Sequence, residues 1–101
     1  MIIIHATFPI DPDERERALE LAADLVAETT EEPGAIEYHA ATDLEDETVL
    51  RFVERYEDAA AFEAHADSEH FRSFADRLPE LLDGEPEVMR FEVADAAELE
   101  L

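Results

Sequence analysis

The sequence contains no cysteine, no lysine and only two glycines among its 101 residues. The absence of cysteine excludes disulfides, thiolate metal sites and cysteine nucleophiles. Without a glycine-rich loop or a lysine, the chain cannot form the phosphate-binding loop of common nucleotide-binding proteins. It also lacks an apolar run of ~20 residues and a basic segment ahead of an apolar one, so we expect neither a spanning helix nor a signal peptide. These absences favour a cytoplasmic domain that does not enter a membrane.

Positive charge is scarce, because 29 acidic residues stand against seven arginines and leave a net charge of −22. Nucleic-acid phosphates and anionic membrane surfaces both attract basic patches, so we expect neither as a partner. The Debye length falls from ~10 Å at ~0.1 M salt to ~3 Å at ~1 M, so concentrated salt removes most repulsion among the carboxylates. The composition therefore favours a halophilic protein of a salt-loaded cytoplasm, and an ordinary acidic domain is the alternative.

The apolar residues suffice for a folded core. Leu, Ile, Val and Phe account for 26 of 101 residues, which exceeds the ~20% below which disorder is the better interpretation. They fall in blocks with the period of two of a strand or the 3.6-residue period of a helix. Turn and capping residues separate these blocks, which predict strands at residues 2–10, 35–42, 48–56 and 88–93 and helices at 11–30, 59–66 and 69–82.

This order of elements is β-α-β-β-α-β, with a break at Asp67-Ser68 inside the second helical segment, and it predicts an α+β ferredoxin-like sandwich. The first and third strands carry apolar residues on both faces, as central strands do, whereas the other two alternate. We expect one domain at residues 1–93 and an acidic C-terminal tail at 94–101, which is either loose or packed on a partner.

The doubly apolar central strands also bear on assembly. Two helices can cover only one face of the sheet, and a sheet-sized apolar patch is unusual on a monomer. Each aliphatic side chain left in water forgoes ~1.5–3 kcal/mol of burial free energy. We therefore expect a homodimer in which two copies pack sheet to sheet about a two-fold axis.

Histidines are the natural candidates for acid–base chemistry near neutral pH. His65 and His70 are five residues apart, which on one continuous helix places them on different faces, roughly 140° apart. The break at Asp67-Ser68 could bring them together, but the sequence offers no third ligand, so we predict no metal. His5 and His39 lie on predicted strands and are interpreted as structural.

Glu54 is the unusual carboxylate. It follows Leu50 and Phe52 at a period of two and precedes Tyr56, so it shares the face of a buried row. A buried carboxylate must be paired, hydrogen-bonded or protonated. Two interpretations remain open: Glu54 makes a structural hydrogen bond or ion pair, or it positions a histidine or a substrate hydroxyl in a pocket. The phenylalanines at positions 62, 71 and 74 are interpreted as core residues, and pocket lining is the alternative interpretation.

Three segments of the chain together resemble the antibiotic biosynthesis monooxygenase family. They are Glu32-Pro33-Gly34-Ala35-Ile36-Glu37-Tyr38, Phe52-Val53-Glu54-Arg55-Tyr56-Glu57-Asp58, and Phe62-Glu63-Ala64-His65-Ala66-Asp67-Ser68-Glu69-His70-Phe71. The likeness covers residues 1–93, and the last segment is most similar to the quinol monooxygenase branch. The resemblance implies a dimeric α+β barrel and, for characterised relatives, oxidation of quinol- or anthrone-type aromatics by O2 without a metal or flavin cofactor.

The resemblance also implies roles for individual residues. His65 is the expected catalytic base, and Glu54 the residue that orients it. Tyr56, Phe62, His70 and Phe71 are the expected residues around a small aromatic or hydrophobic substrate. A non-catalytic dimeric domain that binds a small ligand or serves a stress response is the alternative. Isomerase or signal-molecule chemistry on the same fold is a third possibility, and it would require more polar pocket walls.

Overall fold

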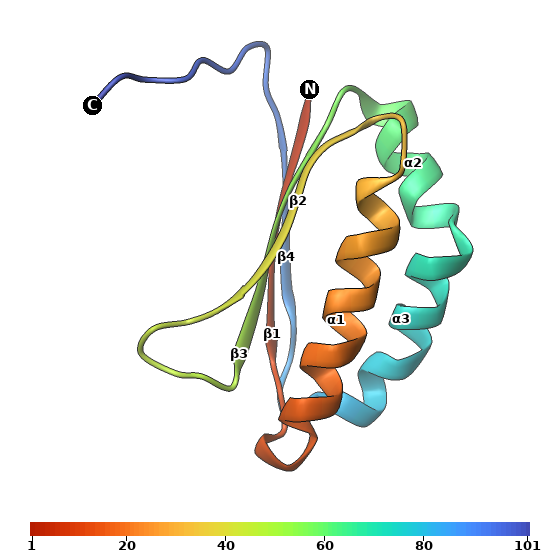
Figure 1. Ribbon diagram of the computed structural model, residues 1–101, viewed down its shortest axis with the longest axis vertical. Helices are drawn as coiled ribbons and strands as arrows, with labels where there is room; N and C mark the ends of the chain where they lie inside the picture. Colours follow the sequence, from red (N-terminus) through yellow and green to blue (C-terminus); the bar gives the residue numbers. More distant parts are fainter.

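The computed structural model describes the whole chain, Met1 to Leu101. Its strands and helices follow one another in the predicted order (Figure 1). The strands are β1 (Ile2–Pro9), β2 (Ala35–Thr42), β3 (Val49–Tyr56) and β4 (Glu87–Glu92). The helices are α1 (Arg15–Thr30), α2 (Ala59–Asp67) and α3 (Glu69–Leu81). The predicted α+β, ferredoxin-like β-α-β-β-α-β plan is confirmed.

The start of α1 differs slightly from the sequence prediction. Residues Pro12–Glu14 form a 3-10 turn, and the α-helix proper begins at Arg15. The Asp11 side chain caps this turn by accepting a hydrogen bond from the backbone N–H of Asp13 at 2.9 Å. Pro12 follows the cap, where its missing N–H leaves no helical hydrogen bond unmade.

The four strands form one antiparallel sheet in the order β2-β3-β1-β4. The first and third strands are therefore central, as their apolar residues on both faces predicted. In the register of the sheet, Glu54 of β3 lies between Tyr38 of β2 and Ile4 of β1, and Ile4 in turn lies beside Arg90 of β4. Glu54 is thus in the middle of the sheet, on the same face as Tyr38 and Ile4.

All three helices pack on one face of the sheet, and the opposite face is bare (Figure 1). The core lies between the helices and the face of the sheet that they cover. Its buried apolar residues come from β1, β3, α1 and α3, with Tyr38 from β2 and Ile10, the residue just after β1. Within the core, the rings of Phe8, Phe52 and Phe74 pack edge to face, with centroids 5.7–6.3 Å apart.

The opposite face, which we call the outer face, has an apolar centre. The register places Ile3 beside Phe91, and His5 between Met89 and Val53. The side chains of Val53, Met89 and Phe91 are 42%, 48% and 39% exposed. The His5 ring packs edge-on against Phe91, with ring centroids 5.2 Å apart. This is the apolar surface that the two-sided pattern of the central strands predicted.

Two details of the edge strands could not be read from the alternation of residues. A β-bulge lies between Ala35 and Glu37, so Ala35 takes the place beside Tyr56 and Ile36 is left 45% exposed. On the other edge, every residue of β4 is exposed. After β4 the tail forms no helix or strand, and it leaves the sheet on the side away from the helices (Figure 1).

The break between α2 and α3 follows the sequence prediction. Ser68 is extended (φ −67°, ψ 151°), ends α2 and caps α3. Its hydroxyl donates to the carbonyl of His65 and accepts from the N–H of Phe71. The two helices are therefore fixed at an angle by one side chain. None of the helices has both the length and the apolar character needed to cross a bilayer.

Candidate functional site

An apolar cavity of about 90 Å³ lies between the sheet and the α2–α3 pair. Glu54 and His65 are the two residues in its wall that can exchange protons, and the others are apolar. The wall consists of Ile4, Ala6, Phe8, Glu54, Phe62, His65, Ala66, Phe71 and Val88. Four of the six residues expected at the site therefore meet around one space: His65, Glu54, Phe62 and Phe71.

His65 lies in the last turn of α2 and is 1% exposed. Its Nδ1 is 2.9 Å from Oε2 of Glu32. A carboxylate only accepts hydrogen bonds, so the imidazole carries its hydrogen on Nδ1. The other ring nitrogen, Nε2, is buried without a hydrogen-bond partner. Because Nδ1 is engaged by Glu32, which is not part of the cavity wall, Nε2 is the ring nitrogen left to accept a hydrogen bond from a ligand.

Aromatic rings hold the His65 imidazole in place. The rings of Tyr38, Tyr56 and Phe71 surround it with centroid distances of 5.2, 5.4 and 5.1 Å. Such packing restricts rotation of the imidazole and keeps water from it. Burial accordingly lowers the pKa of His65 below its ordinary value, while hydrogen bonding to Glu32 opposes that change. A neutral, desolvated imidazole is a competent proton acceptor at neutral pH.

Glu54 is 6% exposed and accepts a hydrogen bond of 2.7 Å from the hydroxyl of Tyr56. Burial raises the pKa of Glu54 to about 7, and the Tyr56 hydrogen bond works in the opposite direction. Burial also raises the pKa of Tyr56, so this phenol remains a neutral donor. Glu54 therefore changes its charge near neutral pH, which is where a group that relays protons must do so.

The carboxylate hydrogen-bonded to His65 is Glu32, whereas Glu54 bonds to Tyr56. Glu32 stands after α1, just before the Pro33-Gly34 turn that leads into β2. Sequence reasoning did not single it out, because it belongs to no periodic row. The available signal was its place in the Glu32-Pro33-Gly34 motif, where a turn fixes the backbone.

The two remaining expected residues lie beside the cavity and do not line it. Tyr56 is fully buried behind Glu54 and packs edge-on against Phe62, with ring centroids 5.4 Å apart. His70 stands at the start of α3, on the far side of Glu32, and its Nε2 binds the same carboxylate oxygen as His65. Tyr56 thus contacts the wall residue Glu54, and His70 contacts Glu32, the hydrogen-bond partner of His65.

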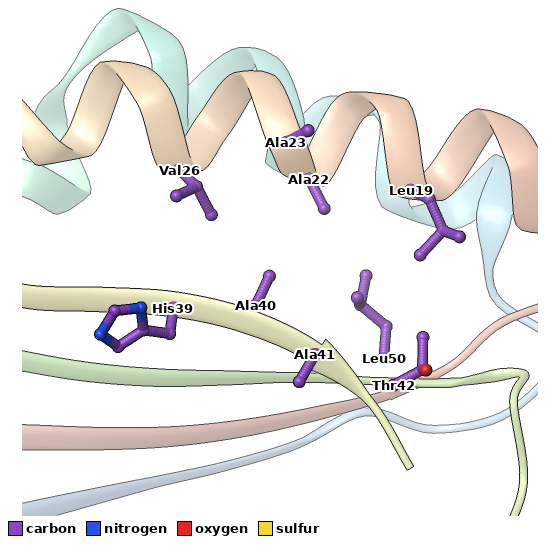
Figure 2. A pocket seen from close by; sticks show the side chains of 9 residues that line it. All are labelled: Leu19, Ala22, Ala23, Val26, His39, Ala40, Ala41, Thr42 and Leu50. Carbon is purple, nitrogen blue, oxygen red and sulfur yellow. The ribbon is translucent and has the colours of Figure 1, made fainter. Parts of the chain in front are cut away.

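A second, larger cavity of about 360 Å³ opens between α1 and β2 (Figure 2). It exists because small side chains face one another there: Ala22 of α1 points toward Ala40 of β2, with Leu19 and Val26 on either side. The one titratable residue in its wall is His39, whose side chain is 69% exposed. With no buried acid or base, this groove offers shape but no acid–base chemistry.

Comparisons with known proteins agree on the family. A family model described as "Antibiotic biosynthesis monooxygenase" matches residues 1–77. The Bacillus subtilis (strain 168) protein named "Putative monooxygenase YcnE" is 30% identical over 95 residues, which are 94% of this chain and all of that protein.

Solved structures of similar proteins have the same fold. A conserved protein from Methanosarcina mazei Go1 is 29% identical, with a TM-score of 0.85 over 89% of each chain. Rv0793 from Mycobacterium tuberculosis is 25% identical, with a TM-score of 0.89 over 96% of this chain and 98% of that one.

Proposed function

Because the chain belongs to the antibiotic biosynthesis monooxygenase family, we propose that it oxidises a small, electron-rich aromatic compound of the quinol or anthrone type with O2, without a metal or flavin. The observation that carries this proposal is the state of His65. Its Nδ1 is held by Glu32, its Nε2 is unpaired, and the residue lines an apolar cavity. That is the arrangement of a general base in a dry pocket.

The reaction needs no cofactor when the substrate is its own reductant. Nε2 of His65 removes a phenolic or benzylic proton, and the resulting anion gives its electrons to O2. A carbon–oxygen bond forms to give a hydroperoxide, whose O–O bond then breaks. One oxygen atom stays on the ring carbon and the other leaves as water. For an anthrone, a CH2 group and O2 become a carbonyl and H2O, so atoms and electrons balance.

Glu54 fits the second half of this reaction. The departing peroxide oxygen must receive protons to leave as water. A carboxyl group with a pKa of about 7 is partly protonated at neutral pH and can supply one. Tyr56 keeps the Glu54 carboxyl in one orientation through its 2.7 Å hydrogen bond. In this scheme His65 is the base and Glu54 is the acid.

The size of the cavity constrains how a substrate enters. A dry cavity of ~150 Å³ accepts one benzene ring, whereas this one measures about 90 Å³. A quinol or anthrone therefore requires the wall to move. The side open to movement is the one formed by Phe62 of α2 and Val88 of β4, because Val88 is 56% exposed. We expect the substrate to enter between α2 and β4.

The test is oxygen uptake with reduced quinols and anthrones in molar KCl. The wild-type protein should consume O2 above the buffer rate, and His65→Ala should not. His39→Ala is a matched control, because His39 is exposed and lies on β2 away from the cavity. Uptake by the wild type equal to that in buffer contradicts the proposal. Binding of the aromatic compound without turnover would instead identify a non-catalytic ligand-binding domain.

We further propose that two copies pair through the outer face and form a dimeric barrel. The exposure of Val53, Met89 and Phe91 supports this, as does the lack of any helix on that side of the sheet (Figure 1). Sedimentation in molar KCl should give a dimer for the wild type and a monomer for Val53→Glu. Leu44→Glu also replaces an exposed aliphatic side chain by a carboxylate, but in a loop, and this variant should remain dimeric. A monomeric wild type would overturn this proposal.

A further inference from the structure

We propose that Glu32, His65 and His70 form a binding site for a divalent transition-metal ion of the zinc type. One donor atom from each residue points to a common space, and the three atoms lie within 4.8 Å of one another. Nδ1 of His65 and Nε2 of His70 are 2.9 and 2.5 Å from the same oxygen of Glu32. The sequence showed only two of these three ligands.

The fold brings these residues together from three elements. His65 ends α2, His70 begins α3, and Glu32 follows α1. On one continuous helix the two imidazoles would point roughly 140° apart. The extended backbone at Ser68 removes that divergence, and the ring centroids are 6.0 Å apart. The convergence therefore depends on the helix break.

The donor set indicates which ions fit. Two imidazole nitrogens and one carboxylate suit zinc and its transition-metal neighbours, whereas magnesium and calcium prefer sites made of oxygen. In a tetrahedral zinc site the metal–ligand bonds are ~2.0–2.2 Å, so neighbouring donors are about 3.4 Å apart. Each of the two imidazole nitrogens needs to move less than about 1 Å away from the Glu32 oxygen to reach that separation. Three protein ligands leave a fourth position for water.

An entry path leads to the site from solvent. The side chains of His70 and Glu32 are 20% and 15% exposed, while that of His65 is 2% exposed. Next to His70, the two carboxylates of Glu28 and Glu69 line an open surface groove together with Ser73. Negative charge at the mouth of a groove raises the local concentration of cations. An ion can therefore reach His70 first and the buried His65 last.

Binding of such an ion changes His65, a consequence that rests on the proposed function. A metal on Nδ1 takes the lone pair there, so the hydrogen of the neutral imidazole moves to Nε2. An Nε2 that carries hydrogen cannot accept a proton from the substrate. The other two ligands, Glu32 and His70, do not line the cavity, so the ion itself does not meet the substrate. The site is therefore inhibitory: the metal blocks the base.

Calorimetric titration with zinc sulfate tests the binding. Chelator-treated protein is used in concentrated sodium sulfate, which screens the acidic surface. We expect about one zinc ion per chain for the wild type and for His39→Ala. His70→Ala should bind at least 100-fold more weakly, although it keeps all 29 acidic residues. Glu32→Gln should weaken binding in the same direction, which guards against a folding defect in one variant. A wild type without a stoichiometric site, or a His70→Ala variant that binds as well as the wild type, overturns the proposal.

A second measurement separates the metal site from the proposed reaction. Zinc should lower O2 uptake by the wild type and by His39→Ala, and a chelator should restore it. The ratio of uptake with and without zinc should be near one for His70→Ala. If zinc binds but leaves uptake unchanged, inhibition through His65 is wrong. If no protein consumes O2, the proposed oxygenase activity is wrong, and the calorimetric result decides the metal site independently.

Discussion

The carboxylate of Glu32 accepts a hydrogen bond from Nδ1 of His65 at 2.9 Å, across 33 positions of the sequence. This contact joins the turn after α1 to the end of α2, and neither of these two segments is part of the sheet. It determines which imidazole nitrogen is left unpaired, and hence what His65 can do chemically. The first prediction concerns this pair.

Replacing Glu32 by Ala should remove the preference of His65 for hydrogen on Nδ1. Nitrogen NMR of the imidazole should show one tautomer in the wild type and a mixture in the variant. If the oxygenase proposal holds, kcat should fall at least about 10- to 100-fold with little change in KM, the range known for losing the carboxylate that orients a metal-bound histidine. Glu32 would then be a positioning residue and His65 the catalytic one.

The control for this prediction is Glu31→Ala, which removes the neighbouring, exposed carboxylate. It should leave both the tautomer and the kinetics unchanged. If Glu32→Ala keeps a single Nδ1–H tautomer, another group orients His65, and the role assigned to Glu32 is wrong.

The second prediction concerns Glu54 and pH. The pKa of Glu54 is about 7 in the folded protein and near its ordinary value of 4.5 when the chain is unfolded. Between those values the folded state holds the proton more tightly, so the stability that Glu54 contributes falls as the pH rises. Above pH ~7 the buried charge has a full cost, which by this shift is roughly 3 kcal/mol as an upper bound.

Glu54→Gln keeps the size and the hydrogen-bond acceptor for Tyr56 but cannot ionise. The free energy of unfolding of the two proteins should be similar near pH 4.5 and should diverge toward pH 8, where the variant becomes the more stable one. Denaturant titrations at several pH values in molar KCl measure this difference. Glu57→Gln, at an exposed position, should track the wild type throughout. A Glu54→Gln variant that is less stable than the wild type at pH 8 would show that Glu54 has a favourable charge partner.

The sequence predicted the parts of this fold that depend on periodicity. Strands apolar on both faces are central, and Ser68 divides two helices where a capping residue interrupts the pattern. The bulge that turns Ile36 toward solvent was not predictable, because a bulge changes no composition and shifts the alternation by one residue. At the site, Glu54 was singled out because a carboxylate in an apolar row is conspicuous, whereas the role expected of His65 came from the resemblance to a family. Glu32 was missed because its role depends on a contact between distant segments.

The third prediction tests how tightly the turn at Gly34 packs on α2. A Cβ added at Gly34 would overlap the Cβ of Ala61, and the backbone of Gly34 itself is not in the left-handed region. Gly34→Ala should therefore destabilise the protein by about 1–3 kcal/mol through overpacking. It should also disturb Glu32, two residues away. Thermal unfolding in molar KCl measures the stability.

Ala61→Gly provides the matched variant, because it removes the methyl group that Gly34→Ala would meet. Alone it should cost about 0.5–1 kcal/mol, as glycine does within a helix. Combined with Gly34→Ala it should recover part of the loss, so the double variant is more stable than the sum of the single changes predicts. Strict additivity would show that the clash is relieved elsewhere.

The fourth prediction concerns salt and the exposed side of α1. Glu16, Glu20, Asp24 and Glu28 recur every four residues and are all exposed, so like charges stand beside one another along the helix. Each such pair destabilises a helix by about 0.2–0.5 kcal/mol at low ionic strength. Glu20→Arg converts two repulsive neighbours into attractive ones. It should raise the melting temperature in dilute buffer, and the gain should shrink as KCl approaches molar concentration, where the Debye length is only ~3 Å.

A control with the same change in net charge isolates the effect of the helix. Glu100→Arg lies in the exposed tail, which forms no helix or strand. If the repulsion acts between neighbours along α1, Glu20→Arg stabilises the protein in dilute buffer and Glu100→Arg does so much less. Equal effects of the two substitutions would mean that the net charge of −22, and not its arrangement on α1, is what concentrated salt relieves. A melting temperature of the wild type that does not change with KCl would contradict both accounts, and with them the interpretation of the acidic surface as an adaptation to salt.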